Sequence, residues 1–355
     1  MHHDLANPAS NRCPFRLRNH HVYREPLTGK LRLAPALAGA SRRPRPVLEP
    51  HVKIRILGSA AGGGFPQWNC NCANCDGVRK GTIDAVPRTQ SSIAISENSI
   101  DWVLVNASPD ILAQIRANPA LQPARAIRDS GICAVLLMDA QIDHVTGLLM
   151  LRERASPLPL YATRQVLAEL SQSLPLTRVL GHYCGIEAHA LGIDGAALTI
   201  PPLVTTTFMP VPLASKAPPY SARRDDPHPG DNIGLAICST ASGRRLFYAP
   251  GLGRLTPPVE AAMRDADVLL VDGTCWSDDE MITLGLSHKS ARMMGHLAQS
   301  GPGGMIEVLD RMPAARKILI HINNSNPILR EDAPERAVLA AHGIEVAADG
   351  MELAL

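Results

Sequence analysis

The residues best suited to chemistry include Cys70, Cys72 and Cys75, which lie within six positions of one another in the segment FPQWNCNCANC. Three soft sulfur ligands at this spacing are typical of a closed tetrahedral zinc site that staples a loop. A Cys72–Cys75 redox pair and a disulfide staple are the alternatives, but a redox pair normally begins a helix in a thioredoxin-like context. We therefore predict a zinc clasp, whose fourth ligand is a distant histidine, Asn324 or another side chain.

Good metal ligands also follow three separate apolar segments. Asp143 and His144 follow AVLLMDAQI, Asp272 ends DVLLVD, and His321 follows KILI. Ligands in layered α/β proteins gather where strands end and loops converge. Two imidazoles with one or two carboxylates form a small open site, as in mononuclear iron(II) oxygenases. The same atoms suit zinc with a bound water, as in hydrolases, so the residues alone leave the metal open.

Two loops permit more than one interpretation. The segment GSAAGGG fits neither phosphate-binding glycine motif and is followed by no lysine, which favours a tight turn with close backbone packing. The segment DPHPGDN places His228 and Asp231 in a Pro/Gly loop that either lines a pocket or forms a rigid turn.

The elements that must position these side chains are strands that alternate with helices. Apolar runs predict strands in VKIRILG, SSIAIS, WVLV, GICAVLLM, RRLFYA, DVLLV and RKILI, and helices are expected at VTGLLMLRER, ARMMGHLAQS and APERAVLAAHG. The fold class is therefore α/β or a layered α+β. Residues 1–51 are rich in Pro, Arg, His and Ala, so we expect a disordered N-terminal extension before one domain at 52–355.

Composition excludes several classes of function. The net charge is only +2 and aromatic residues make up 3% of the chain, which argues against binding to nucleic acid. No run approaches the roughly 18 apolar residues of a membrane span. Outside the cluster the cysteines are scattered, several inside apolar runs, which is typical of reduced thiols in a cytoplasmic protein.

The motifs together resemble one family in order from about Val52 to the C-terminus. LGSAAGGGFPQWNCNCANC, PRTQSSIA, NASPDI, QIDHVTGLL, DPHPGDN, LFYAPGLG, LLVDGT, MGHLAQSGPGG and LIHINNSNPIL are similar to the coenzyme PQQ synthesis protein B family of the metallo-β-lactamase superfamily. This resemblance implies an αββα sandwich, in which two β-sheets face each other and helices cover both outer sides.

The resemblance also implies a single catalytic metal. The superfamily motif is His-x-His-x-Asp-His, and the matching stretch here is DAQIDH. Asp139 and Gln141 replace the two leading histidines, which would build the first metal position, while Asp143 and His144 are retained. The second position remains, formed by Asp143, His144, Asp272 and His321, and this disfavours two-metal hydrolysis.

The function implied is iron(II)- and oxygen-dependent hydroxylation of the tyrosine ring of a Glu–Tyr-derived precursor of pyrroloquinoline quinone (PQQ). Substrate carboxylates would pair with cationic residues in motif loops, for which the candidates are Arg88, Lys216, Arg223 and His228. A binding protein that carries PQQ or its precursor to the periplasm is the alternative, and a zinc hydrolase is weaker. Related superfamily members bind zinc at Cys-x-Cys-x-x-Cys with a fourth ligand histidine, and Asn324 occupies that position here.

Overall fold

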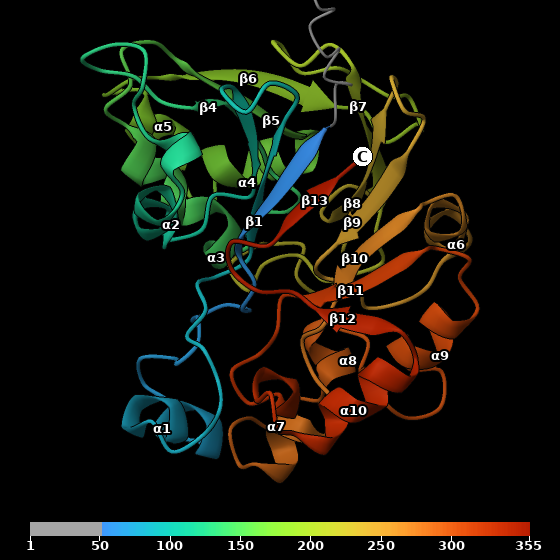
Figure 1. The fold of residues 1–355 in the computed structure, drawn as a ribbon. Helices are drawn as coiled ribbons and strands as arrows, with labels where there is room; N and C mark the ends of the chain where they lie inside the picture. Colours follow the sequence, from blue (N-terminus) through green and yellow to red (C-terminus); the bar gives the residue numbers. More distant parts are fainter. Residues whose placement is uncertain (1–51) are drawn as a thin grey trace, which may run out of the picture. The chain divides into compact units, whose positions relative to one another are not determined.

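The computed structural model describes residues 52–355, and the extension predicted for residues 1–51 lies outside them. Within the described residues, two β-sheets face each other (Figure 1). The strand order is β13-β1-β2-β3-β4-β5-β6 in the seven-stranded sheet and β12-β11-β10-β9-β8-β7 in the six-stranded sheet. Strands β3 to β6 are parallel to one another, as are β9 to β12, so the carboxyl ends of several strands meet at one edge of each sheet.

The strands have the following bounds. The first sheet contains β1 (Lys53–Gly58), β2 (Ser92–Ser96), β3 (Trp102–Val105), β4 (Ile132–Leu136), β5 (Leu158–Thr163), β6 (Ile186–Leu191) and β13 (Glu352–Ala354). The second contains β7 (Thr206–Pro212), β8 (Ile233–Ser239), β9 (Arg245–Ala249), β10 (Val268–Asp272), β11 (Arg316–Ile320) and β12 (Ile344–Val346).

The strands are apolar on both faces because both faces of each sheet are covered. In β10, Val268 and Leu270 point into the core between the sheets, whereas Leu269 and Val271 point into the core beneath the outer helices. Successive side chains of a strand alternate between faces, so a continuous apolar run is what a doubly covered strand requires. The strands predicted from apolar runs in the sequence are confirmed, as β1, β2, β3, β4, β9, β10 and β11.

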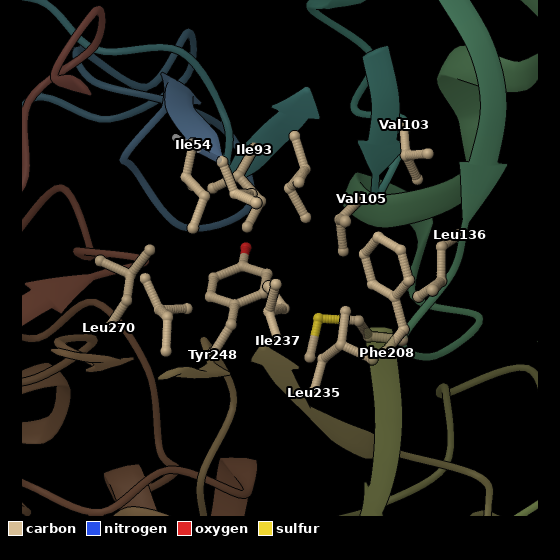
Figure 2. Close-up of a cluster of buried hydrophobic side chains, with 14 of the residues drawn as sticks. Ile54, Ile93, Val103, Val105, Leu136, Phe208, Leu235, Ile237, Tyr248 and Leu270 are labelled. Atoms are coloured by element: carbon tan, nitrogen blue, oxygen red, sulfur yellow. The ribbon is translucent and has the colours of Figure 1, made fainter. Parts of the chain in front are cut away.

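The core between the sheets is built from interdigitating aliphatic and aromatic side chains. Figure 2 shows Ile54, Ile93 and Leu136 of the first sheet facing Phe208 and Tyr248 of the second. Each of these side chains is fully buried. This contact fastens the two sheets together and fixes the relative positions of the strand ends.

Helices cover the outer face of each sheet (Figure 1). Buried residues of α2 (Ile111–Ala117), α4 (Arg164–Ser171) and α5 (Leu176–Leu180) pack on the first sheet. Those of α6 (Pro257–Arg264), α9 (Met305–Asp310) and α10 (Pro334–Ala341) pack on the second. The predicted αββα sandwich is therefore confirmed. The remaining helices are α1 (Ala73–Lys80), α3 (Ile142–Val145), α7 (Glu280–Thr283) and α8 (Ala291–Met294), with 3₁₀ turns at Pro119–Leu121, Thr146–Leu151 and Pro327–Leu329.

Two predicted helices differ from the structure. The helix expected over VTGLLMLRER is instead the 3₁₀ helix Thr146–Leu151, which follows the single α-helical turn Ile142–Val145. The helix expected over ARMMGHLAQS is only α8, since Gly295 has a positive φ of 99° that ends it. Residue His296 therefore lies in a loop.

Candidate metal centre

Three side chains from distant parts of the sequence converge at the predicted strand ends. The Nε2 atoms of His144 and His321 lie 3.6 Å and 3.5 Å from Asp143 Oδ2, respectively. The ring centroids of the two histidines are 5.4 Å apart. Two imidazole nitrogens and a carboxylate oxygen thus face one another in a group that can hold a metal ion.

The chain brings these residues together through both sheets. Residues Asp143 and His144 lie in α3, the short helix that follows β4. Residue His321 directly follows β11 and has a positive φ of 61°, which is uncommon for a residue other than glycine. This backbone turn ends the strand, so the strained conformation marks a position held by its surroundings.

Neighbouring side chains fix the orientation of both imidazoles. The carboxylate oxygens of Asp139 lie 2.8 Å and 2.9 Å from His144 Nδ1. The hydroxyl of Thr274 lies 3.0 Å from His321 Nδ1. With each Nδ1 occupied, each Nε2 is left to face Asp143. Support of this kind orients imidazole ligands in metal sites and sets their tautomer.

The donor set fits a metal cation. His144 Nε2 is buried and has no hydrogen-bond partner among residues 52–355, so a favourable contact is missing at the atom that faces the centre. Burial lowers the pKa of His144, but the Asp139 and Asp143 carboxylates outweigh it and raise the pKa to about 9. Burial raises the pKa of Asp143, yet His144 and His321 hold it below its usual range. The carboxylates around the two histidines thus favour a positive charge at this position.

Residue Asp272 lies beside this group but is differently engaged. Its Oδ1 accepts hydrogen bonds from the amide and hydroxyl of Thr274, and its Oδ2 accepts one from the Leu252 amide and lies 2.7 Å from His296 Nδ1. A carboxylate offers about four acceptor positions. Protein groups thus contact both oxygens, and Asp272 also lies in a group of ligand type with His296 and His321, so its ligand role stays a prediction.

Reasoning from the sequence did not single out His296. Its ring stacks on that of His321 with centroids 5.3 Å apart, and its Nδ1 is held by Asp272. His296, Asp272 and His321 form a second group of ligand type that shares His321 with the first. The available signal was a histidine next to a helix-ending glycine in MGHLAQSGPGG.

The three clustered cysteines also converge, at the start of α1. Asn324 Nδ2 lies 3.1 Å from Cys70 Sγ, 3.7 Å from Cys72 Sγ and 3.3 Å from Cys75 Sγ, and Asn324 is buried. Burial raises the pKa of the Cys72 thiol to about 11, so its thiolate requires a nearby cation. Asn74 Nδ2 donates to the Asn324 carbonyl, which holds this segment against the cysteine loop.

The four residues predicted to contact substrate are placed in two different ways. Arg88 is buried, donates to the Ala347 carbonyl and lies 3.3 Å from Ser59 Oγ. Arg223 forms ion pairs of 2.8 Å with Asp231 and 3.0 Å with Glu169. Both guanidinium groups are thus engaged within the protein. Asp231, which pairs with Arg223, lies in a turn that this ion pair holds in place.

Lys216 and His228 instead line one open cleft. Its volume is about 960 Å³, and its walls come from the loops around residues 212–216, 227–229, 253–258 and 292–311. Lys216 forms no ion pair within the described residues, and exposed His228 has only the exposed Asp226 carboxylate nearby, at 3.6 Å, whereas Arg88 and Arg223 are engaged internally.

Comparison with known proteins defines the class and then the family. Residues 101–322 match the Beta-lactamase superfamily domain. "Coenzyme PQQ synthesis protein B" of Cupriavidus taiwanensis is 68% identical over 302 residues, which cover 85% of this chain and 99% of the relative. The protein of the same name from Cupriavidus necator is 67% identical over 304 residues, covering 86% of this chain and 100% of that protein.

A solved structure agrees with this assignment. The crystal structure of Zn²⁺-bound PqqB from Methylobacterium extorquens has a TM-score of 0.76 and 40% sequence identity, and the match covers 85% of this chain and 100% of that one. The fold and the metal-type site define a member of the metallo-β-lactamase superfamily. Within it, the chain belongs to the coenzyme PQQ synthesis protein B family. In residues 52–355, no helix has the length and apolar character needed to cross a membrane.

Proposed function

We propose that this protein is an iron(II)- and oxygen-dependent hydroxylase of PQQ synthesis that acts on the tyrosine ring of a Glu–Tyr-derived precursor. The observation that carries the proposal is the convergence of His144 Nε2, His321 Nε2 and Asp143 Oδ2 at one point. Two histidines and one carboxylate with open positions are the ligand set of non-haem iron(II) oxygenases. When bound, iron(II) would supply the activation of dioxygen.

The surrounding residues would keep this site mononuclear and correctly oriented. Asp139 holds His144 Nδ1, and Thr274 holds His321 Nδ1, so both Nε2 atoms remain directed at the metal position. Asp139 and Gln141 stand where a two-metal hydrolase of the superfamily has histidines, which disfavours zinc hydrolysis.

His296 is suited to move a proton of the substrate. Asp272 occupies its Nδ1, which leaves Nε2 free to accept a proton from the phenol of a substrate tyrosine. Asp272 would then stabilise the imidazolium that forms. Metal binding and proton removal would thus be separate tasks, the first of Asp143, His144 and His321 and the second of His296.

We propose a second, structural metal site at Cys70, Cys72, Cys75 and Asn324. Rotation of the Asn324 amide by 180° would direct Oδ1 instead of Nδ2 at the three sulfur atoms, and the two orientations are nearly indistinguishable in shape. Zinc is the metal that three thiolates favour. The PqqB structure from Methylobacterium extorquens is Zn²⁺-bound, which supports zinc binding in the family.

Residues 52–355 are proposed to act as one domain in the cytoplasm. The two sheets share a continuous core, which supports one domain. All seven cysteines in the described part of the chain are free, as expected for a reducing compartment.

Turnover tests the proposed reaction directly. Metal-free protein is loaded with iron(II) without air, oxygen and a Glu–Tyr dipeptide are added, and mass spectrometry measures products that have gained one oxygen atom. We expect the product with iron and not with zinc. His321→Ala should abolish it, whereas His342→Ala should not, since His342 lies at the surface, paired with Asp310.

A binding or carrier protein for PQQ or its precursor is the second candidate. The cleft that contains Lys216 and His228 favours it, because a volume of about 960 Å³ accommodates a small ligand. If no product forms while the dipeptide or PQQ still binds, including to His321→Ala, the carrier function replaces hydroxylation.

A further inference from the structure

We propose that the open cleft beside the metal centre is an anion subsite that binds the carboxylates of a small aromatic polycarboxylate. We call it the basic cleft and define it by Lys216, His228, Arg254, Arg292 and Arg311, which are the titratable residues in its lining. The inference rests on the proposed function, because it assigns the substrate's carboxylates a place next to that centre. Three of these residues, all arginines, were not predicted from the sequence.

The charge of the basic cleft is of one sign. Among the described residues that line it, none is Asp or Glu. Lys216, Arg254, Arg292 and Arg311 form no ion pair within 4.0 Å with any other residue of 52–355. By contrast, Arg223 nearby pairs with two carboxylates. Four permanent cations without partners, around a hollow, favour a ligand with two or more negative charges.

The cations reach the basic cleft from different elements of the fold. Lys216 follows β7, Arg254 follows β9, Arg292 lies in α8 and Arg311 directly follows α9. Convergence of like charges from four elements is unfavourable for the folded chain by itself. A ligand that offsets this repulsion gives the arrangement a physical reason.

The basic cleft is connected to the metal centre through residues that adjoin both in the chain. Gly295 lines the cleft and directly precedes His296, and Gly253 lines it and directly follows Leu252, whose amide donates to Asp272. Ser215 Oγ donates to the Gly295 carbonyl at 3.2 Å. A Cβ atom at Gly253 would lie 2.7 Å from that same carbonyl, so only glycine permits this close packing. A ligand in the cleft would therefore lie one loop away from His296.

The remaining lining suits the hydrophobic part of such a ligand. It includes the apolar side chains of Leu213, Leu255, Leu297 and Val308. Apolar surface with a few charged groups that fix orientation is the usual composition of a small-molecule site. An aromatic ring with several carboxylates satisfies both parts of this surface.

Binding measurements test the basic cleft without requiring turnover. Isothermal titration calorimetry measures the dissociation constants of PQQ, a tricarboxylate, and of the Glu–Tyr dipeptide for the full chain and its variants. Arg254→Ala, Arg292→Ala and Arg311→Ala should each weaken binding about tenfold, since a charge-assisted hydrogen bond contributes that much. Arg116→Ala and Arg178→Ala are matched controls, because these exposed arginines lie on α2 and α5, over the other sheet.

The inference is wrong if neither compound binds the full chain, or if the cleft variants bind as tightly as the controls. Since all three arginines are exposed, the variants should fold, and unchanged circular dichroism would verify this. Arginine-dependent binding without any hydroxylated product would refute the proposed reaction and leave the anion subsite standing. If all three variants retain hydroxylation at an unchanged KM, the anion subsite would be refuted and the proposed reaction would stand.

Discussion

At the scale of single residues, the candidate site depends on which nitrogen of each histidine is occupied. Asp139 and Thr274 engage the Nδ1 atoms of His144 and His321, so the Nε2 atoms face Asp143. Asp139 stands at a position where the superfamily motif has a histidine. Its carboxylate instead contacts His144 and orients it. In the proposed site, this substitution would remove one ligand and orient the histidine that remains.

Removal of this support should weaken metal binding. Asp139→Ala deletes the acceptor of His144 Nδ1, and loss of such a partner typically lowers metal affinity about 10- to 100-fold. Competition with a chromophoric chelator measures the affinity for iron(II). Asp139→Asn keeps an acceptor oxygen, so its affinity for iron(II) should lie between those of the unchanged protein and Asp139→Ala. Gln141→Ala is the control, because the Gln141 side chain reaches only the Lys216 carbonyl, at 3.5 Å; equal affinities of the two alanine variants would refute the supporting role.

Sequence reasoning at this scale could predict which residues lie together where their type and their place at strand ends are informative, and their role as metal ligands stays a prediction. The residues Asp143, His144 and His321 are ligand types at strand ends, and the structure brings them together. It missed His296 because the apolar residues around it were interpreted as one longer helix, whereas the positive φ at Gly295 ends the helix just before this histidine. It could not foresee that Arg88 and Arg223 are engaged within the protein, since Ala347 and Glu169 lie far from them in the sequence.

At the scale of elements, close backbone contacts hold the short helices against the strand ends. The amide of Ala107 donates to the His144 carbonyl, and the amide of Gly147 donates to the Ala107 carbonyl. These bonds fasten the turn that contains Asp143 and His144 to the loop after β3. Strand positions were predictable from apolar runs, whereas this contact joins residues far apart in the sequence and has no local signal.

Substitution of Gly147 should separate these two elements. A Cβ atom there would clash with the backbone carbonyl groups of Ser108 and Ala107, which cannot move aside as a flexible side chain could. We expect Gly147→Ala to lower the free energy of unfolding by about 1–3 kcal/mol, as overpacking does. Gly181→Ala is the control, because its Cβ would lie 3.3 Å from its nearest neighbour and its φ is −59°. Denaturant unfolding measures both, and equal stabilities would contradict this account.

The cysteine cluster has a different mechanical task, since it fastens α1 to the segment after β11. Cys75→Ala should release one zinc ion per chain and increase amide hydrogen exchange over residues 65–80, while the strands stay protected. Cys184→Ala is the control, because Cys184 lies outside the cluster. Unchanged zinc content in Cys75→Ala would argue against the clasp.

At the scale of the whole molecule, the sandwich places the ends of strands from both sheets at one site. Asp143 and His144 follow strand β4 of the first sheet. Asp272 ends β10 and His321 follows β11, both in the second sheet. The site therefore depends on the core between the sheets. The layered class was predictable from apolar strands that alternate with helices, but the pairing of the sheets came from the family resemblance.

Truncation of a large side chain in this core should destabilise the whole molecule. Phe208 is fully buried between the sheets (Figure 2). Phe208→Ala should reduce the free energy of unfolding by about 3–5 kcal/mol. Val204→Ala, at a residue that is 74% exposed, should change it by less than about 0.5 kcal/mol. Thermal unfolding compares the two, and a small effect at Phe208 would mean that the sheets are held together elsewhere.

The central claim is that one metal ion binds among Asp143, His144 and His321. Anomalous diffraction at the iron absorption edge, from crystals loaded with iron(II), locates and counts the ions at this site. The account predicts one iron peak, in contact with the Nε2 atoms of both histidines and with Asp143. Two adjacent peaks, or a single peak held by Asp272 and His296 without Asp143, would contradict it.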